Sequence, residues 1–377
     1  MFDDVTGKIP GRFSDLFKKK KKRCVGVDVG NSSIKIVELE KKGDKIVLKN
    51  YSITRTNKKG LVKPGSSKII DTEVGDIVKK ILDEIEVKTK NINVAIPSFA
   101  SLVTTIELPP ASEKEIEQII QVEAPKYIPV PLEEIVYGWE IINDKAESDE
   151  QKNESKITKA SDKSMIKVVL VSVMKSISQE YEKVFQKSGY NIDSLEIDAF
   201  ALKRAMVGDD QKSYLMVDIG GTITNISVIV NGSVVANRSI DVGGERMTEL
   251  LSKALGVNEE RAEKIKVSQG FEIESREIKT QVLEPFFKNI SDEIVKSIEV
   301  FDENYPNLEI DSLVLTGGLS QMKGVINFLE NKIKIKIVEG NPWLKIVYPK
   351  KIENSLFSLN PYFGVAIGLA LKGLMEE

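Results

Sequence analysis

Two short glycine-containing turns hold the residues of this sequence whose types and spacing could do chemistry. The first set is Asp28, Gly30, Asn31, Ser32, Ser33 and Lys35, and the second is Asp218, Gly220, Gly221, Thr222 and Asn225. Glycine lets a polyphosphate approach the backbone, tight turns aim successive N–H groups into one concavity, and hydroxyl groups add donors. Both turns are therefore predicted to bind phosphate groups.

The aspartates at the start of each turn predict a metal ion. Asp28 and Asp218 end apolar strands, and bare carboxylates beside phosphate groups would repel them. We therefore expect both side chains to hold water molecules of a Mg²⁺ ion that bridges phosphate oxygens, while Lys35 neutralises charge directly. Each turn alone is weak evidence, because Asp-x-Gly turns are common, but two matched turns are hard to obtain by chance.

The two turns belong to units that repeat 190 positions apart. The first unit reads as a hairpin over 25–39, a strand over 46–53 and a helix over 71–86. The second reads as a hairpin over 215–230, a strand over 233–240 and a helix over 245–255. This duplication predicts a two-lobed α/β fold.

The segment between the units predicts an inserted α+β subdomain. Strands are expected over 92–96 and 166–173 and a helix over 178–187, and Ser112 with Glu115 forms a capping box for a helix that ends near Ala124. Residues 143–164 are almost wholly polar and predict a surface loop. After the second unit, a strand at 313–315 leads through Thr-Gly-Gly-Leu into a helix toward Glu330. A terminal helix over 362–375 contains Gly364 and Gly368, which allow close packing.

The composition excludes several kinds of site. The 377 residues include Cys24 as the single cysteine and no histidine, which rules out an intramolecular disulfide, a Cys/His zinc site and imidazole catalysis. No apolar stretch of about 18 residues and no signal core is present, so we expect a cytoplasmic protein. The Gly-x4-Gly-Lys-Ser/Thr and Gly-x-Gly-x-x-Gly phosphate-binding motifs are also absent.

Charge is distributed unevenly along the chain. Residues 1–23 carry eight Lys/Arg and three Asp, a net +5, within a chain of net −3. The run Lys18–Arg23 follows Phe13, Leu16 and Phe17, a pattern compatible with an anionic membrane surface or an acidic partner, although a solvated leader is the simpler interpretation. Nucleic-acid binding is disfavoured, because no basic patch interleaved with aromatic residues follows.

Taken together, these motifs resemble the superfamily of actin, the heat-shock ATPase chaperones, sugar kinases and the bacterial division protein FtsA. Its two phosphate motifs match 25–39 and 217–225, and its adenosine motif matches 315–319 with Gly317 and Gly318. The resemblance implies ATP or ADP with Mg²⁺. It also assigns a glycine turn to Gly243 and Gly244, and ribose and adenine contacts to Glu263 and Lys266, for which a solvent-facing ion pair is the alternative.

One further residue is implied as catalytic by this resemblance. The stretch 196–201 is similar to the first connecting motif, in which Asp198 would orient the attacking water. An exposed helix carboxylate is the alternative. Binding is better supported than turnover, so ATPase activity is expected to be weak or absent.

Within this superfamily, the chain most resembles the PilM family of type IV pilus assembly. The resemblance is carried by Thr-Thr-Ile-Glu-Leu-Pro at 104–109 and by 123–134, with its Tyr-Ile-Pro and Pro-Leu-Glu-Glu, and it runs from about residue 24 to the end. It implies a cytoplasmic scaffold at the inner face of the cytoplasmic membrane that binds the N-terminal tail of a PilN-like inner-membrane protein, tuned by nucleotide. Pilus motor ATPases and a platform protein are further expected partners, and membrane association is expected through partners.

The tail is expected to bind the inserted subdomain. Ile116, Ile119, Ile120 and the turn at Tyr127-Ile128 could offer apolar pockets beside a strand edge, or could form the subdomain's own core. The alternatives for the whole protein are an FtsA-like division or filament-forming ATPase and, less favoured, a small-metabolite kinase. The expected division is a leader 1–23, lobe I 24–100, the inserted subdomain 101–188, a connection 189–210, lobe II 211–340 and a return to lobe I over 341–377.

Overall fold

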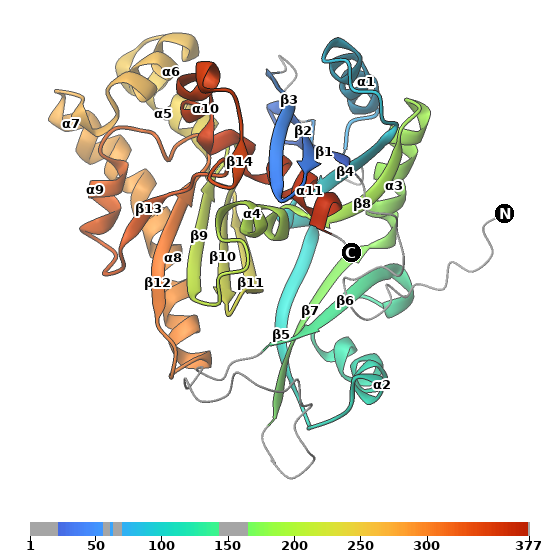
Figure 1. The fold of residues 1–377 in the computed structure, drawn as a ribbon. Helices are drawn as coiled ribbons and strands as arrows, with labels where there is room; N and C mark the ends of the chain where they lie inside the picture. The colour runs from blue at the N-terminus through green and yellow to red at the C-terminus, as the bar shows by residue number, and fades with distance from the viewer. Residues whose placement is uncertain (1–21, 56–60, 63–69, 143–164, 376–377) are drawn as a thin grey trace.

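The computed structural model describes residues 22–55, 61–62, 70–142 and 165–375. They form two α/β lobes side by side and a smaller third sheet (Figure 1). The predicted α/β, two-lobed and duplicated fold with an inserted α+β part is confirmed. Most of the leader and the whole polar segment 143–164 lie outside the described residues.

The first lobe is built on a six-stranded sheet with the order β14-β3-β2-β1-β4-β8. Its strands are β1 (Arg23–Val29), β2 (Ser33–Lys42), β3 (Lys45–Arg55), β4 (Asn91–Ile96), β8 (Asn191–Ile197) and β14 (Ile346–Val347). Its helices are α1 (Val74–Glu84), α3 (Lys175–Lys187), α10 (Glu353–Phe357) and α11 (Asn360–Met375). The alternating valines of β1 are buried against α1 and α3, while Leu39 and Leu48 pack on α11.

The second lobe repeats this arrangement around a five-stranded sheet with the order β11-β10-β9-β12-β13. Its strands are β9 (Ser213–Ile219), β10 (Thr224–Val230), β11 (Ser233–Ile240), β12 (Ile310–Thr316) and β13 (Ile337–Glu339). Its helices are α5 (Gly244–Leu255), α6 (Glu259–Ser268), α7 (Arg276–Ile278), α8 (Glu284–Asn304) and α9 (Val325–Glu330). Asp28 lies opposite Lys35 in the first hairpin and Asp218 opposite Asn225 in the second, so the two hairpins have the same register.

The helix expected after Gly318 begins later than the sequence suggests. Turns occupy residues 317–324 before α9 starts at Val325. Gly317 and Gly324 adopt left-handed φ angles of 84° and 76°, so the backbone cannot run directly from the strand into a helix.

The inserted part is a three-stranded antiparallel sheet with one covering helix. The order is β5 (Ser101–Leu108), β7 (Ile166–Met174) and β6 (Ile135–Ile141), with α2 (Glu113–Glu123) packed on it. The predicted capping box is confirmed: Glu115 Oε2 accepts from the Ser112 backbone N–H at 2.7 Å. Ile116 and Ile120 of this helix and Ile128 after it are buried, so of the two interpretations that the sequence left open, the structure supports the one in which they form the subdomain's own core.

Two helices lie between the lobes in Figure 1 and pack against each other, α4 (Asp198–Met206) and α11. A Cβ atom placed on Gly368 would lie 1.8 Å from the Ala201 carbonyl oxygen. A Cβ atom on Gly364 would instead meet the end of the Leu202 side chain. The predicted close packing of α11 is confirmed, and glycine sets the distance between the two helices. No described helix is both long enough and apolar enough to cross a bilayer.

Replacing Gly368 tests this crossing. We expect Gly368→Ala to lower the free energy of unfolding by about 2–3 kcal/mol, because the new methyl group overlaps backbone that cannot move aside, and this exceeds the gain in helix propensity of about 1 kcal/mol. The matched variant Gly364→Ala meets movable side-chain ends and should lose less than about 1 kcal/mol. Urea denaturation measures both, and equal losses would contradict a crossing limited at Gly368.

Candidate functional site

A cavity of about 920 Å³ opens between the two lobes. The two hairpin turns, the start of α4, the end of β12, α6 and the start of α11 all contribute to its wall. The residues that the sequence singles out for the site all line this cavity, with the exception of Gly243. Segments far apart in the sequence thus meet at one place, and the volume is in the range of small-molecule sites.

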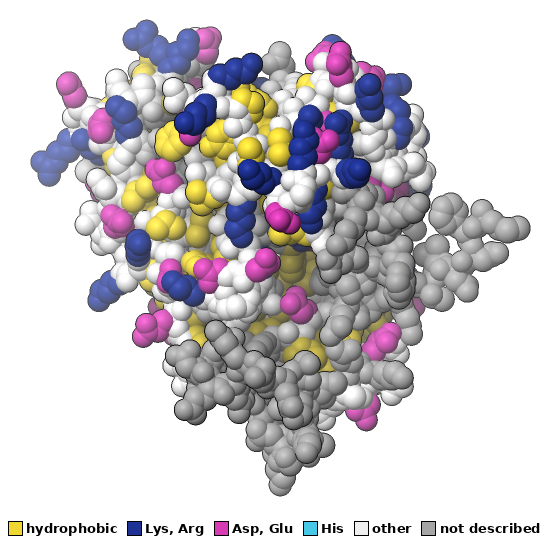
Figure 2. Space-filling view, viewed as in Figure 1, with side chains coloured by type: hydrophobic (Ala, Val, Ile, Leu, Met, Phe, Trp, Pro, Cys, Tyr) yellow, Lys and Arg dark blue, Asp and Glu magenta, His cyan; other side chains and the backbone are white. Residues whose placement is uncertain are grey.

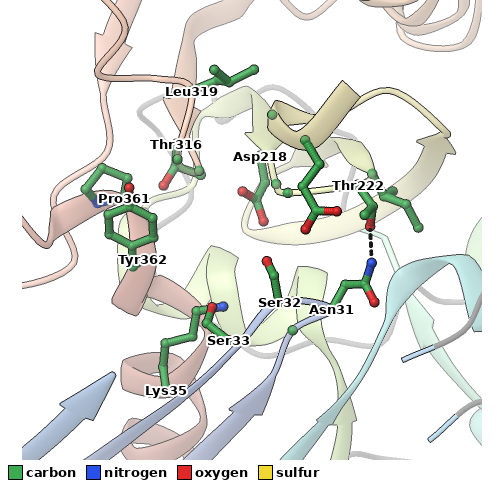
Figure 3. A pocket seen from close by; sticks show the side chains of 18 of the residues that line it. Asn31, Ser32, Ser33, Lys35, Asp218, Thr222, Thr316, Leu319, Pro361 and Tyr362 are labelled. Atoms are coloured by element: carbon green, nitrogen blue, oxygen red, sulfur yellow. Dashed lines mark hydrogen bonds between the residues drawn. The ribbon is translucent and has the colours of Figure 1, made fainter. Parts of the chain in front are cut away.

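The two hairpin turns face each other across the cavity. In each turn, the N–H of a glycine donates a hydrogen bond of 3.0 Å across the turn. Gly30 donates to the Ser33 carbonyl, and Gly220 donates to the Ile223 carbonyl. Asn31 Nδ2 donates to Thr222 Oγ1 at 3.2 Å, which joins the turns directly (Figure 3). The internal repeat therefore produces two equivalent turns that converge on one space.

Ser32 of the first turn also lies close to the second turn. A Cβ atom on Gly221 would lie 3.0 Å from Ser32 Oγ. Figure 3 shows Ser32 and Ser33 on the first turn pointing toward the side that carries Asp218. Glycine at 221 therefore keeps the gap between the turns open for hydroxyl and amide donors.

Three carboxylates share the cavity. Asp28 is paired with Lys35, whose Nζ lies 3.2 Å from Asp28 Oδ2. Burial and the nearby charge of Asp198 raise the pKa of Asp218 to about 7, with Lys35 acting in the opposite direction. These negative charges disfavour one another, so the site favours a cation or protons.

Asp198 begins α4 and is partly buried in the cavity wall, so it is not the exposed helix carboxylate of the alternative interpretation. Burial raises the pKa of Asp198 to about 6, although the Ser98 hydroxyl, which donates a hydrogen bond to it, acts to lower that pKa. Ser98 lies just after β4, in the short turn that leads into β5. A carboxylate with this pKa can exchange a proton near neutral pH.

The glycine pair before α5 supports the second turn from behind. The N–H of Gly244 donates to the Gly220 carbonyl at 2.9 Å, and the N–H of Glu245 donates to the Gly221 carbonyl at 2.8 Å. A Cβ atom on Gly243 would lie 2.5 Å from that same Gly221 oxygen, so only glycine permits the approach. Gly244 lines the cavity, whereas Gly243 holds the turn in place.

The pair on α6 lies in the cavity wall, where Glu263 is partly exposed and Lys266 is not. Lys266 is buried and bonds with Glu263, with the Gly244 carbonyl at 3.0 Å and with Thr248 Oγ1 at 2.9 Å. The ion pair of the alternative interpretation therefore exists, but it fixes α6 against the start of α5 beside the cavity. A contact of this pair with ribose or adenine stays a prediction.

The far wall is made by the end of β12 and the start of α11. Gly317 has room for no side chain, because a Cβ atom would lie 2.4 Å from Asp218 Oδ1. Gly318 packs against the ring of Tyr362, because a Cβ atom placed on Gly318 would lie 3.3 Å from a carbon of that ring. Thr316 is buried, and its Oγ1 has no hydrogen-bond partner among the described residues.

Several lining residues escaped the sequence interpretation. They include Arg55, Glu245, Thr316, Pro361 and Tyr362. Ser98, which donates a hydrogen bond to the lining residue Asp198, also escaped it. Thr316 directly precedes the predicted Gly317-Gly318 turn, and Pro361 opens the terminal helix, so those positions carried a weak signal. Ser98 and Arg55 carried none, because only the tertiary fold brings their segments to the cavity.

Comparison with known proteins decides the family. The family model described as "Type IV pilus assembly protein PilM" matches residues 26–374. The chain belongs to the PilM family. That match includes both hairpins, the inserted subdomain and the terminal helix.

More distant relatives are division proteins. FtsA of Pseudomonas aeruginosa is 24% identical over 233 residues, which cover 56% of this chain and 54% of that protein. FtsA of Bacillus subtilis is 23% identical over 357 residues, which cover 84% of this chain and 78% of that protein. The match thus spans about half the length of the Pseudomonas protein and more of the Bacillus one.

Solved structures show the same fold. A PilM-PilN type IV pilus biogenesis complex aligns with a TM-score of 0.76 at 22% identity, covering 94% of this chain and 99% of that one. MreB5 of Spiroplasma citri bound to ADP aligns with a TM-score of 0.53 at 13% identity, covering 94% of this chain and 96% of that one. The predicted actin-like fold is confirmed.

The raised pKa of Asp218 predicts a pH-dependent stability. Its folded pKa of about 7 lies above the unfolded value of about 3.9, so the stability that this group contributes is fully present below pH 4 and is lost as the pH rises through 7. We expect Asp218→Asn, which cannot ionise, to melt about 2–4 °C higher than the parent at pH 8 without nucleotide and with a chelator present. The difference should shrink toward pH 5, and a lower melting temperature of the variant at pH 8 would contradict the account.

Proposed function

We propose that this protein binds ATP or ADP with Mg²⁺ in the cavity between its lobes. The observation that carries the proposal is the pair of equivalent turns, each preceded by an aspartate, that face each other across one cavity. The MreB5 structures with ADP and with AMPPNP support it as relatives in fold.

The residues present fit such a ligand. Asn31 Oδ1 and Thr316 Oγ1 are buried polar atoms without a partner among the described residues, and glycines keep the space beside both turns clear. In the proposed complex, the turn amides with Ser32, Ser33 and Thr222 bind phosphate oxygens. Asp28 and Asp218 would hold the Mg²⁺ ion, which would supply positive charge beside the phosphate groups.

The remaining lining residues fit the nucleoside. The buried Lys266 with Glu263 and the small residues Gly317 and Gly318 also line the cavity. These groups would take ribose and adenine. Asp198, held by Ser98, would orient a water molecule, and with no second base identified we propose weak or absent ATPase activity.

We further propose that the protein is a scaffold of type IV pilus assembly at the inner face of the cytoplasmic membrane, binding the N-terminal tail of a PilN-like protein. Family membership and the fold shared with the PilM-PilN complex support this. On the subdomain, Val122 near the end of α2 is 70% exposed, and Tyr127, within the family stretch 123–134, is 44% exposed. Motor ATPases and a platform protein are proposed as further partners.

A hydrogen-bonded path supports nucleotide-tuned binding of that partner. Asp198 in the cavity wall accepts from Ser98, and the Ser98 carbonyl accepts from Ser101 Oγ at 2.8 Å. Ser101 is the first residue of β5, a strand of the subdomain sheet. A ligand that repels or neutralises Asp198 would thus act on the joint between lobe I and the subdomain.

A second candidate function is an FtsA-like filament-forming ATPase, which the similarity to FtsA over 84% of the chain favours. Sedimentation with ATP separates the two, because a filament pellets and a scaffold stays in solution. A small-metabolite kinase has no comparable support, since none of the predicted site residues provides a base over an acceptor hydroxyl.

The nucleotide proposal predicts the effect of removing either aspartate. Asp28→Ala and Asp218→Asn should each weaken Mg-ATP binding at least about tenfold, because each loses a magnesium contact, while the exposed Asp311→Asn should bind as the parent does. Isothermal calorimetry on variants with parental circular dichroism measures this. Parental affinity in both cavity variants would overturn the proposal.

The scaffold proposal predicts where a partner tail binds. Val122→Ser combined with Tyr127→Ser should lower capture of a PilN-like tail peptide about tenfold or more, since both side chains are exposed apolar contacts. Val300→Ser, a 50%-exposed valine on α8, is the matched control and should retain capture. Pull-down with the immobilised peptide gives the readout, and undiminished capture after replacement of 101–188 would refute this location.

A further inference from the structure

A second surface lies on the outer face of the first sheet, away from the cavity. In β3, Leu48 points into the core against α11, so Lys45, Val47 and Lys49 point to the opposite, solvent face. Val347 of β14 lies beside Val47 in register, and Lys42 of β2 lies opposite Lys45. This face joins exposed apolar and basic side chains on one edge of the sheet.

Residues that flank β14 extend the same chemistry. Leu344 is 77% exposed, Val347 46% and Phe357 63%, and Lys350 and Lys351, three and four residues after the strand, are exposed. Figure 2 shows hydrophobic side chains gathered over α10 and β14 beside β3, with Lys and Arg side chains around them. We call this region, formed by 22–23, 40–49, 344–353 and Phe357, the basic-apolar face.

The charge of this face is opposite in sign to that of the whole chain. Its segments 22–23, 40–49 and 344–353 contain nine Lys/Arg and three Asp/Glu, a net +6, while the chain has a net −3. Of the three acids, Glu40 is already surrounded by Arg23, Lys42 and Lys49 at 2.9–3.6 Å. The surplus positive charge therefore faces solvent.

The basic leader joins the chain at this face. The Lys22 carbonyl accepts from the Lys41 N–H at 2.8 Å, and Arg23 pairs with Glu40 across β1 and β2. Three strand spacings separate β1 from β14, about 15 Å, so Lys22, which the lysine run with Phe13, Leu16 and Phe17 precedes in the sequence, lies close to the exposed Val347 and the lysines of this face. Two stretches of the same basic and apolar composition are thus linked at one end of the sheet.

We propose that the basic-apolar face binds an anionic lipid bilayer directly. Lysines and arginines are attracted to anionic headgroups, and Phe, Leu and Val enter the interface between headgroups and acyl chains. The leader is not the occupant of this face, because it carries the same charge. A second copy in a two-fold contact would bring two basic faces together, so the bilayer is the complementary partner.

This contact goes beyond the proposed function, in which partners supply the membrane association. It would orient the chain with the edge of the first sheet at the membrane, independently of nucleotide and of the partner tail. None of Leu344, Val347, Lys350, Lys351 or Phe357 lines the cavity, so the two sites can be tested separately.

Flotation of the purified full chain with vesicles tests the proposal. The parent should bind vesicles of phosphatidylcholine mixed with phosphatidylglycerol at least about tenfold better than vesicles of phosphatidylcholine alone. Lys350→Glu with Lys351→Glu should lose about tenfold or more of that binding, and Leu344→Ser with Phe357→Ser should lose a similar factor. The matched controls Lys332→Glu with Lys334→Glu and Val300→Ser should bind within about twofold of the parent.

Mg-ATP calorimetry and circular dichroism on the same variants should give parental values, which separates this test from that of the nucleotide proposal. Neutralising Lys18–Lys21 should weaken binding further without abolishing it. Equal binding to both kinds of vesicle, parental binding by the face variants, or dependence on the leader alone would overturn the proposal. Self-association without vesicles that the same variants abolish would also overturn it, in favour of a second copy.

Discussion

Mutual repulsion among Asp28, Asp198 and Asp218 is the constraint around which the site is arranged. Each comes from a different element, and all three line one cavity, with Lys35 beside Asp28. Burial makes their shared charge costly, as the pKa of about 7 for Asp218 and about 6 for Asp198 indicates. A protein keeps such a cost where a ligand relieves it, and a metal-bound polyphosphate brings the cation that these acids favour.

The close crossing of α4 and α11 holds this arrangement together. Gly368 lets α11 touch the backbone at Ala201, only three residues after Asp198, and Tyr362 at the start of α11 supports Gly318. The same residue, Asp198, is bonded to Ser98 at the entrance to the subdomain. One carboxylate thus lies where both lobes and the inserted subdomain meet, which gives nucleotide and partner a common element to act on.

The sequence predicted the two hairpins, the duplication and the capped helix α2, because each depends on local periodicity or on a few adjacent residues. It could not predict Arg55 or Tyr362 as lining residues, or Ser98 as the partner of Asp198, since only tertiary packing brings their segments to the cavity. For Ile116, Ile120 and Ile128 the sequence left both open pockets and a core role possible, because an amphipathic helix shows which residues are apolar but not whether a sheet already covers them. The motif at 123–134 was enough to indicate the PilM family, and the match over 26–374 confirms it.

A crystal structure of the full chain with Mg²⁺ and a non-hydrolysable ATP analogue would test the central claim most directly. The account predicts a triphosphate between the turns at 30–33 and 220–222, with a metal ion whose water shell contacts both Asp28 and Asp218. A nucleotide bound elsewhere, or bound here with either aspartate turned away from the metal, would contradict it.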